Sequence, residues 1–227
     1  MSTLLLRLAA PIQSWGVASK FDTRMTEREP TKSGVIGMLA AALGVRRDDT
    51  DALEELSSLR FGVRVDREGE LLNDFHMAHA VKSSYVTHRY YLCDAVFLCG
   101  LESEDRGALE RYAYALTHPV FPLFLGRRSC PPTLPVVWGI RECELEAALM
   151  NEPSLIPNLQ PVRTVIDAPL SDTGAAVIKD IPISFSSYRR EFGYRKAREV
   201  ILQKNKQTEH DPFAELEAEY VSDTNGA

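Results

Sequence analysis

The sequence predicts an α+β fold, in which helical segments alternate with buried strands. Residues 3–10 (TLLLRLAA) and 91–101 (YLCDAVFLCGL) are nearly continuous apolar runs of the length of a buried strand. A third apolar segment, residues 33–43, begins at Ser33, a residue type that caps helices, and is followed by Gly44, where a helix commonly stops. With 227 residues, 44% of them apolar, the chain can bury a core in one large domain or two small ones.

The remaining elements follow from periodicity and from the residues that end each run. Phe61, Val63 and Val65 alternate with arginines, as in a half-buried strand. Residues 70–91 are polar, aromatic and rich in histidine, and we interpret them as a hairpin that projects from the sheet. The predicted elements, in order, are a strand over 3–10, helices over 33–43 and 48–59, a strand from 60, the hairpin over 70–91, a strand over 91–101, a helix over 104–118 and a strand over 135–142.

This order is that of a ferredoxin-like β-α-β-β-α-β domain with a hairpin insertion. Both crossover helices should lie side by side on one face of the sheet, leaving the other face free for ligands. We therefore expect a ferredoxin-like domain over 1–142, a smaller β-rich C-terminal extension over 143–208 and an acidic, disordered tail over 209–227. Within the extension, residues 188–202 (YRREFGYRKAREVIL) are basic and are interpreted as a helix or an arm.

The net charge of −6 argues against a nucleic-acid partner until its distribution is considered. Residues 209–227 hold six carboxylates and no lysine or arginine, so the rest of the chain carries 26 basic and 26 acidic residues. Residues 75–93 contain no acid but hold lysine, arginine and three histidines, and the stretch from Arg111 to Arg141 holds four arginines and no acid. Such windows can form basic surfaces on a neutral body.

Composition also limits the compartment and the chemistry. Arg7 interrupts the apolar start of the chain and no run is long enough to span a membrane, so we expect a cytoplasmic protein. The four cysteines form no C-x-x-C pair and are expected to be free thiols. His76 and His79 lack a paired ligand motif, and no catalytic motif is present, so we expect neither a metal nor a cofactor.

Two early segments carry residues suited to RNA. Gln13, Ser14 and Trp15 offer hydrogen bonds and a stacking face for an unstacked base; the alternative is a turn whose Trp15 fills the edge of the core. Lys32 and Ser33 start a helix, where N–H groups and the lysine would bind a phosphate; the alternative is a simple helix cap.

The hairpin mixes Lys82, His88 and Arg89 with tyrosines such as Tyr85. This mixture is typical of a single-stranded RNA contact, although an exposed hairpin with cross-strand aromatic pairs would use the same residues. His88 with Tyr85 or Lys82 is also a candidate for metal-independent RNA cleavage, with the imidazole as the base.

A loop over 122–132 (PLFLGRRSCPP) places Arg127 and Arg128 side by side between prolines. They are either a solvated pair or guanidinium groups that a stiff loop holds for phosphate contacts and base stacking.

Four ordered motifs resemble the Cas-family-five proteins of CRISPR surveillance complexes, in the repeat-associated mysterious protein superfamily. They are LRLAAPIQSWG, EREPTKSGVIGMLAAALGVRRDD, YLCDA and FLGRRSCPP, and they span about residues 3–141. The resemblance implies an RRM-like form of the ferredoxin-like domain with a protruding β-hairpin thumb over about 67–91. It also implies a non-catalytic subunit of an antiviral Cascade ribonucleoprotein complex, which caps the 5′ handle of the CRISPR RNA. The implied partners are the CasC backbone subunit, the large subunit CasA and, indirectly, target DNA.

The resemblance and the motifs together give the residues expected at the RNA. These are Gln13, Ser14, Trp15, Arg24, Lys32, Ser33, Lys82, Tyr85, His88, Arg89, Arg127, Arg128 and Ser129. In type I-E complexes a separate subunit, CasE, cuts the RNA, whereas type I-C relatives cleave precursor RNA themselves. The endoribonuclease alternative therefore stays open.

Overall fold

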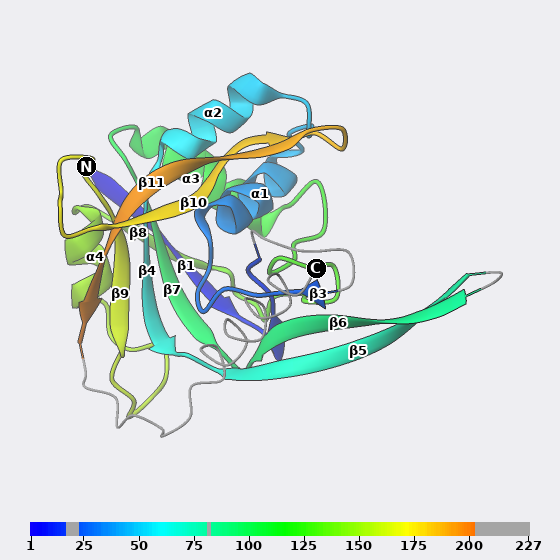
Figure 1. The fold of residues 1–227 in the computed structure, drawn as a ribbon. Helices are drawn as coiled ribbons and strands as arrows, with labels where there is room; N and C mark the ends of the chain where they lie inside the picture. The colour runs from blue at the N-terminus through cyan, green and yellow to red at the C-terminus, as the bar shows by residue number, and fades with distance from the viewer. Residues whose placement is uncertain (17–22, 81–82, 203–227) are drawn as a thin grey trace.

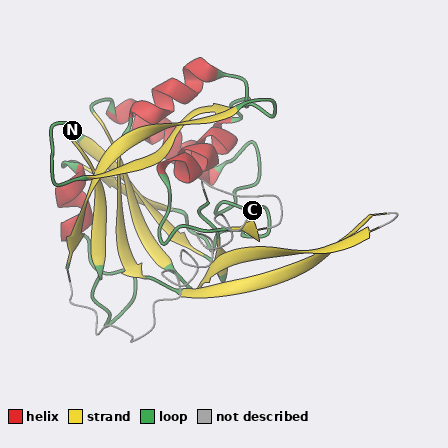
Figure 2. Cartoon of the chain, in the orientation of Figure 1, coloured by secondary structure: helices red, strands yellow, loops and turns green. Residues whose placement is uncertain are grey.

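The computed structural model describes residues 1–16, 23–80 and 83–202. They form an α+β fold with two largely antiparallel sheets (Figures 1 and 2). The larger sheet has seven strands in the order β10-β11-β9-β4-β7-β1-β8. These strands are β1 (Ser2–Ala9), β4 (Arg60–Arg67), β7 (Val96–Ser103), β8 (Val137–Arg141), β9 (Arg163–Ala168), β10 (Ala176–Phe185) and β11 (Arg190–Ile201).

The smaller sheet begins where β1 and β4 end. It contains β2 (Ile12–Gln13), β3 (Thr23–Arg24), β5 (Glu70–Ala80) and β6 (Ser83–Cys93). The apolar run expected to be one strand over 91–101 is therefore divided between β6 and β7, and that prediction was wrong. Asp94 lies between them with φ at 56°, a left-handed conformation that ends one strand and lets the next enter the other sheet.

Three helices cover one face of the large sheet: α1 (Lys32–Leu43), α2 (Thr50–Ser58) and α3 (Arg106–Thr117). Leu4, Leu6 and Leu8 of β1 belong to the core cluster on this face, and α1 packs directly on α3, as the sequence predicts. Fully burying each leucine stabilises the fold by about 1.5–3 kcal/mol.

The opposite face of the sheet was expected to be free, but a fourth helix covers part of it. Leu145 and Leu149 of α4 (Leu145–Asn151) pack against Leu5, Leu98 and Ile166 in a second cluster. Alternation along β1 explains both faces, because successive strand side chains point to opposite sides. The part of this face under α4 is therefore not free for a ligand.

Helix α1 ends where the sequence predicts but is capped by a different residue. Thr31, not Ser33, is the N-cap, and its hydroxyl accepts a hydrogen bond from the Gly34 N–H at 3.2 Å. At the other end Gly44 adopts φ 75°, and its N–H bonds to carbonyls of the last turn.

The segment over 188–202 is a strand, not the expected helix or arm. In β11 the buried side chains of Arg195 and Ala197 alternate with exposed ones, which is the periodicity of a strand. The β10–β11 hairpin crosses over the helices (Figure 1), where Ser57 of α2 donates a hydrogen bond to the carbonyl of Pro182 at 3.1 Å.

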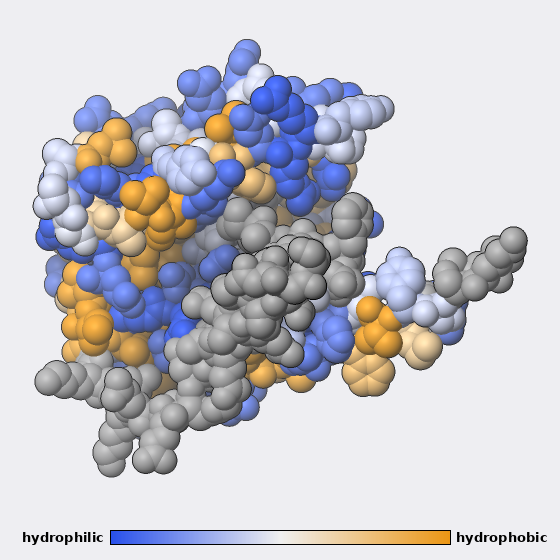
Figure 3. Space-filling view, in the orientation of Figure 1, coloured by the Kyte–Doolittle hydropathy of each residue, from blue (hydrophilic) through white to orange (hydrophobic). Residues whose placement is uncertain are grey.

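A long hairpin formed by β5 and β6 projects from the body (Figure 1). Eleven residue pairs join its strands, from Glu70 opposite Cys93 to Ala80 opposite Ser83, a length of roughly 35 Å at 3.3–3.4 Å per residue. Hydrophobic residues gather on one side of it (Figure 3), where Phe75 and Met77 are both more than half exposed. Among the described residues, no helix is long and apolar enough to cross a bilayer.

Candidate nucleic-acid interface

A groove of about 1300 Å³ runs along helix α1. Its floor is a face of small residues, which includes Gly37, Ala41 and Gly44. Phe121 and Phe124 line one wall, and Phe185 with Phe192 of the β10–β11 hairpin line the other. Twelve residues of helix at 1.5 Å each make this floor about 18 Å long.

The groove is strongly positive. Asp48 is its one acidic lining residue among those the structure describes, and the basic lining residues are Arg24, Arg46, Arg47, Arg127, Arg128 and Arg190. Arg46 bonds to Asp48 at 3.2 Å, but both side chains remain largely exposed, so this pair is weak. Aromatic walls beside guanidinium groups are the combination that single-stranded nucleic acids use, through stacking and phosphate contacts.

The wall formed by residues 121–128 is fixed to the body by backbone contacts. Near its start, the Phe121 N–H donates to the carbonyl of Ala41 in α1 at 3.3 Å. Near its end, Gly126 has φ 87° and lies so close to Ser14 that a Cβ there would come within 1.6 Å of the Ser14 carbonyl oxygen. Only glycine fits this position, so the loop is held in one place along the helix.

The adjacent arginines of this loop have different surroundings. Arg127 donates to the carbonyls of Arg24 and Met25 at 2.9 and 3.1 Å, and its guanidinium carbon lies 4.7 Å from the ring centroid of Tyr91. Arg128 is exposed and, among the described residues, makes no hydrogen bond or ion pair. Arg127 is thus braced by the protein, whereas Arg128 is available at the groove.

Ser129 completes the loop. Its hydroxyl is exposed and lies 3.4 Å from the Tyr91 hydroxyl. The next residue, Cys130, is buried, and burial raises the pKa of its thiol, although a hydrogen bond from Ser129 acts in the opposite direction. The buried thiol is therefore part of the loop's packing.

The segment Gln13 to Trp15 is turned inward. The Gln13 amide is fully buried, donating to the Ala95 carbonyl at 2.7 Å and accepting from the Trp15 indole N–H at 3.1 Å. The Ser14 hydroxyl donates to the Tyr90 carbonyl at 3.3 Å. Trp15 is 1% exposed, as in the alternative reading of a turn whose tryptophan fills the core edge. Gln13 therefore lies behind the groove, whereas Ser14 and Trp15 line its floor with little exposed surface.

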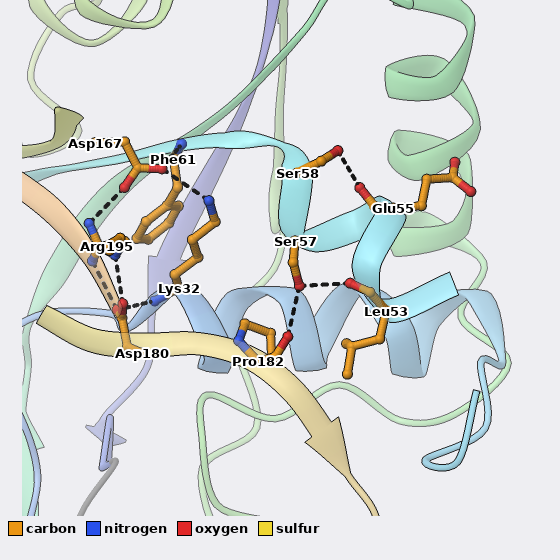
Figure 4. Close-up of polar contacts among 10 residues, drawn as sticks. All are labelled: Lys32, Leu53, Glu55, Ser57, Ser58, Phe61, Asp167, Asp180, Pro182 and Arg195. Atoms are coloured by element: carbon orange, nitrogen blue, oxygen red, sulfur yellow. Dashed lines mark hydrogen bonds and ion pairs between the residues drawn. The ribbon is translucent and has the colours of Figure 1, made fainter. Parts of the chain in front are cut away.

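Lys32 and Ser33 are also buried. The anionic groups at the start of α1 are carboxylates of the protein, those of Asp167 and Asp180. The Lys32 N–H donates to Asp180 at 2.8 Å, and its ammonium group contacts Asp167 at 3.0 Å (Figure 4). Arg195 joins the same two carboxylates, at 2.6 Å to Asp180 and 2.8 Å to Asp167. The chain's own carboxylates thus occupy the position predicted for a phosphate. The alternative, that Ser33 is a simple helix cap, is also wrong, because Thr31 is the N-cap.

This buried network of two cations and two carboxylates joins α1 to β9, β10 and β11. Desolvation lowers the pKa of Arg195, but hydrogen bonds and charge from Asp180 and Asp167 outweigh it, so the pKa is raised and the group stays charged. The network fixes the β10–β11 wall of the groove relative to its floor.

On the hairpin, side chains alternate between the two faces of strand β6, so the residues expected to contact RNA lie on different faces. Tyr85 is 55% exposed and shares a strand face with Thr87 and Arg89, whereas His88 points to the other face and lies 3.3 Å from the Asn73 amide oxygen. Lys82 lies outside the described residues. Arg24 of β3 pairs with Arg89 of β6 and is exposed.

Several groove residues were absent from the sequence prediction. Arg46 and Arg47 were detectable, since they form an arginine pair that begins two residues after the helix-ending Gly44. Phe185, Arg190 and Phe192 were not, because only the crossing of the β10–β11 hairpin over α1 brings the C-terminal part of the chain to the site.

Comparison with known proteins identifies the family. Residues 3–198 match the family model of CRISPR-associated protein (Cas_Cas5). The CRISPR system Cascade subunit CasD of Escherichia coli (strain K12) is 37% identical over 171 residues, which are 66% of this chain and 76% of that protein.

Two solved structures share the fold. A chain of a CRISPR RNA-guided surveillance complex superposes with a TM-score of 0.71 at 33% identity, covering 88% of this chain and 89% of that one. A crystal structure of a Cas protein gives a TM-score of 0.69 at 41% identity, covering 89% and 95%. The chain therefore belongs to the Cas5 family of CRISPR-associated proteins.

Proposed function

We propose that this chain is a non-catalytic RNA-binding subunit of a Cascade-type surveillance complex, which holds the 5′ handle of the CRISPR RNA. The observation that carries the proposal is the groove along α1, which the described residues line with six arginines, a single acid and phenylalanine walls. The similarity to a Cascade subunit and to a chain of an RNA-guided surveillance complex supports it. In this role the protein acts in the cytoplasm and contacts a CasC-type backbone subunit and a CasA-type large subunit.

The fold fits this role. Strands β4, β7, β1 and β8 lie in the order that a ferredoxin-like, RRM-like core requires, with α1 and α3 together on one face. We assign residues 1–142 to this core, 143–208 to an extension whose strands lengthen the same sheet, and 209–227 to a tail outside the described residues. We assign the β5–β6 hairpin as the thumb at the junction of handle and guide.

The proposed contacts divide by exposure. We assign direct RNA contact to exposed or half-exposed groups, which are Arg24, Tyr85, His88, Arg89, Arg127, Arg128 and Ser129, together with Lys82 and the groove arginines Arg46, Arg47 and Arg190. We assign a supporting role to the buried groups Gln13, Ser14, Trp15, Lys32 and Ser33, because their polar atoms bond within the protein.

The test is RNA binding by a double variant, Arg46→Ala with Arg128→Ala, in the assembled complex and with the isolated chain. Charged hydrogen bonds contribute about 1.5–3 kcal/mol each, so affinity for the repeat-derived 5′ segment should fall at least about tenfold. Each lost phosphate contact should also reduce the slope of log K against log salt by about 0.7. Arg111→Ala, on α3 and outside the groove, is the matched control. Unchanged affinity and slope in the double variant would reject the groove as the RNA site.

The endoribonuclease alternative has weaker support. His88 lies on the face of β6 opposite Tyr85, so the imidazole and the phenol do not converge on one phosphate. Lys82, the other candidate partner of His88, lies outside the described residues. We expect precursor repeat RNA to stay intact when incubated with the protein in EDTA. Cleavage that His88→Ala abolishes would favour the enzyme instead.

A further inference from the structure

The groove along α1 carries positive charge that the described part of the chain does not neutralise. Six arginines line it against one acid, Asp48, which pairs with Arg46. Among the described residues, none of the other five lining arginines has an acidic partner, whereas the buried Arg64, Arg163 and Arg195 all do. Without RNA, the groove therefore attracts any anionic group that can reach it.

The opposite charge is concentrated in residues 209–227, the acidic segment, which lies outside the described residues. This segment holds six carboxylates and no lysine or arginine. Carboxylates accept the same paired hydrogen bonds from a guanidinium group as phosphates do, so the segment offers arginines the same kind of contact as a nucleic-acid backbone. It also contains Phe213 and Tyr220, whose rings suit the phenylalanine walls. Its charge and side chains are therefore complementary to the groove.

The described chain ends near enough to the groove for the acidic segment to reach it. The Leu202 N–H donates to the carbonyl of Val162 at 2.8 Å, and the neighbouring Arg163 bonds to Glu29 at 2.7 Å. Glu29 is four residues along the chain from Met25, which lines the groove. These steps sum to roughly 35 Å at most, a distance that about ten extended residues span. The greater part of the acidic segment can therefore reach the groove.

We propose that, when no RNA is bound, the acidic segment occupies the groove along α1 and pairs with its arginines. The inference rests on the proposed function, because it makes the segment a competitor of the RNA for one site. Since the segment belongs to the same chain, its effective concentration at the groove is about millimolar, and weak contacts are enough to hold it there. An RNA binds when its contacts outweigh those of the segment, so the groove rejects RNAs that it binds only weakly.

The first test measures the accessibility of the acidic segment in the full-length, RNA-free protein. A glutamate-specific protease cuts within the segment, and mass spectrometry separates these cuts from those elsewhere. Each exposed ion pair is a factor of about 1.4–5 in stability, so the double variant Arg46→Ala with Arg128→Ala should be cut about 2–25 times faster. Adding the repeat-derived RNA to the wild type should also accelerate these cuts, whereas Arg111→Ala should be cut as the wild type is. Equal rates in the wild type and the double variant would overturn the proposal.

The second test measures RNA affinity after two charges are removed from the acidic segment. Glu217→Gln with Glu219→Gln should bind the RNA about 2–25 times more tightly, because two pairs that compete with the RNA are lost. The matched control is Glu104→Gln with Glu144→Gln, which removes the same charge from two exposed positions that do not line the groove. Its affinity should change less than about twofold. An equal gain in both double variants would indicate a general effect of net charge and would reject the docked segment.

The docked segment and the proposed function fail on different results. If RNA binding depends on the groove arginines but the acidic segment is cut at the same rate with and without RNA, the segment is not in the groove and the proposed function stands. If RNA affinity does not depend on the groove arginines, the proposed function fails. In that case the cutting rate of the double variant Arg46→Ala with Arg128→Ala still decides whether the segment occupies the groove.

Discussion

Replacing Asp180 with alanine removes the centre of the buried network at the start of α1. The Asp180 carboxylate is 1% exposed and accepts three hydrogen bonds, at 2.6 and 2.9 Å from Arg195 and at 2.8 Å from the Lys32 N–H. In the variant, Arg195 and the Lys32 ammonium share the single carboxylate of Asp167, and the Lys32 N–H loses its partner.

Breaking a buried ion pair by removing one partner costs about 3–5 kcal/mol, because it leaves an uncompensated charge. For a chain of this size, each kcal/mol lowers the melting temperature by about 2–4 °C, so the expected decrease is about 6–20 °C. Urea denaturation followed by far-ultraviolet circular dichroism measures the same change as a lower transition midpoint.

The matched control is Glu110→Ala, which removes the exposed i,i+4 pair between Arg106 and Glu110 on α3. Such pairs contribute about 0.3–0.5 kcal/mol, so its melting temperature should change by no more than about 2 °C. If Asp180→Ala were as stable as this control, the reasoning that the network holds the β10–β11 wall on α1 would be refuted.

Three further outcomes are expected. Gly126→Ala should lower the melting temperature, since its Cβ would overlap the Ser14 carbonyl oxygen; normal stability by thermal melting would contradict this. Burial raises the pKa of Cys99 well above its usual value, so iodoacetamide should label Cys99 only on unfolding; peptide mapping that finds Cys99 itself labelled quickly in the native protein would show that strand β7 is not buried. Hydrogen bonding to Arg141 lowers the pKa of Glu152 in the folded protein. The pair therefore stabilises the fold above the unfolded pKa of about 4.3, and this stabilisation is lost as the pH falls through the folded pKa. Glu152→Gln should remove this part of the acid dependence of the melting temperature, measured from about pH 3 to 7.

Local patterns predicted the elements that depend on local rules. The apolar run of β1, the alternation in β4 and the glycine that ends α1 each determine a strand or a helix end within a few residues. The N-cap was misplaced from Thr31 to Ser33 because both residue types cap helices, and only the backbone conformation, extended at Thr31, distinguishes them.

The site depended on contacts that no local pattern reveals. Gln13 and Lys32 are polar residues of the type that binds RNA, yet Gln13 bonds to Ala95 and Lys32 to Asp167, more than eighty residues away. The basic segment of β11 was interpreted as a helix or an arm for the same reason, since Asp167 and Asp180 neutralise its Arg195 inside the fold. From sequence alone, a charged residue is predicted to lie on the surface, because the buried partner that would neutralise it is not visible in the local pattern.

The burial of Trp15 has a practical consequence for experiments. Its ring lies directly behind Gly34, where an added Cβ would be 2.8 Å from it, and Gly34 and Trp15 both line the groove. The other tryptophan, Trp138, is on β8 and bonds to Glu152 away from the groove. A Trp138→Phe protein would therefore carry a single tryptophan, which lies at the floor of the groove, so that occupation of the groove can be followed by selectively excited tryptophan emission without any attached label.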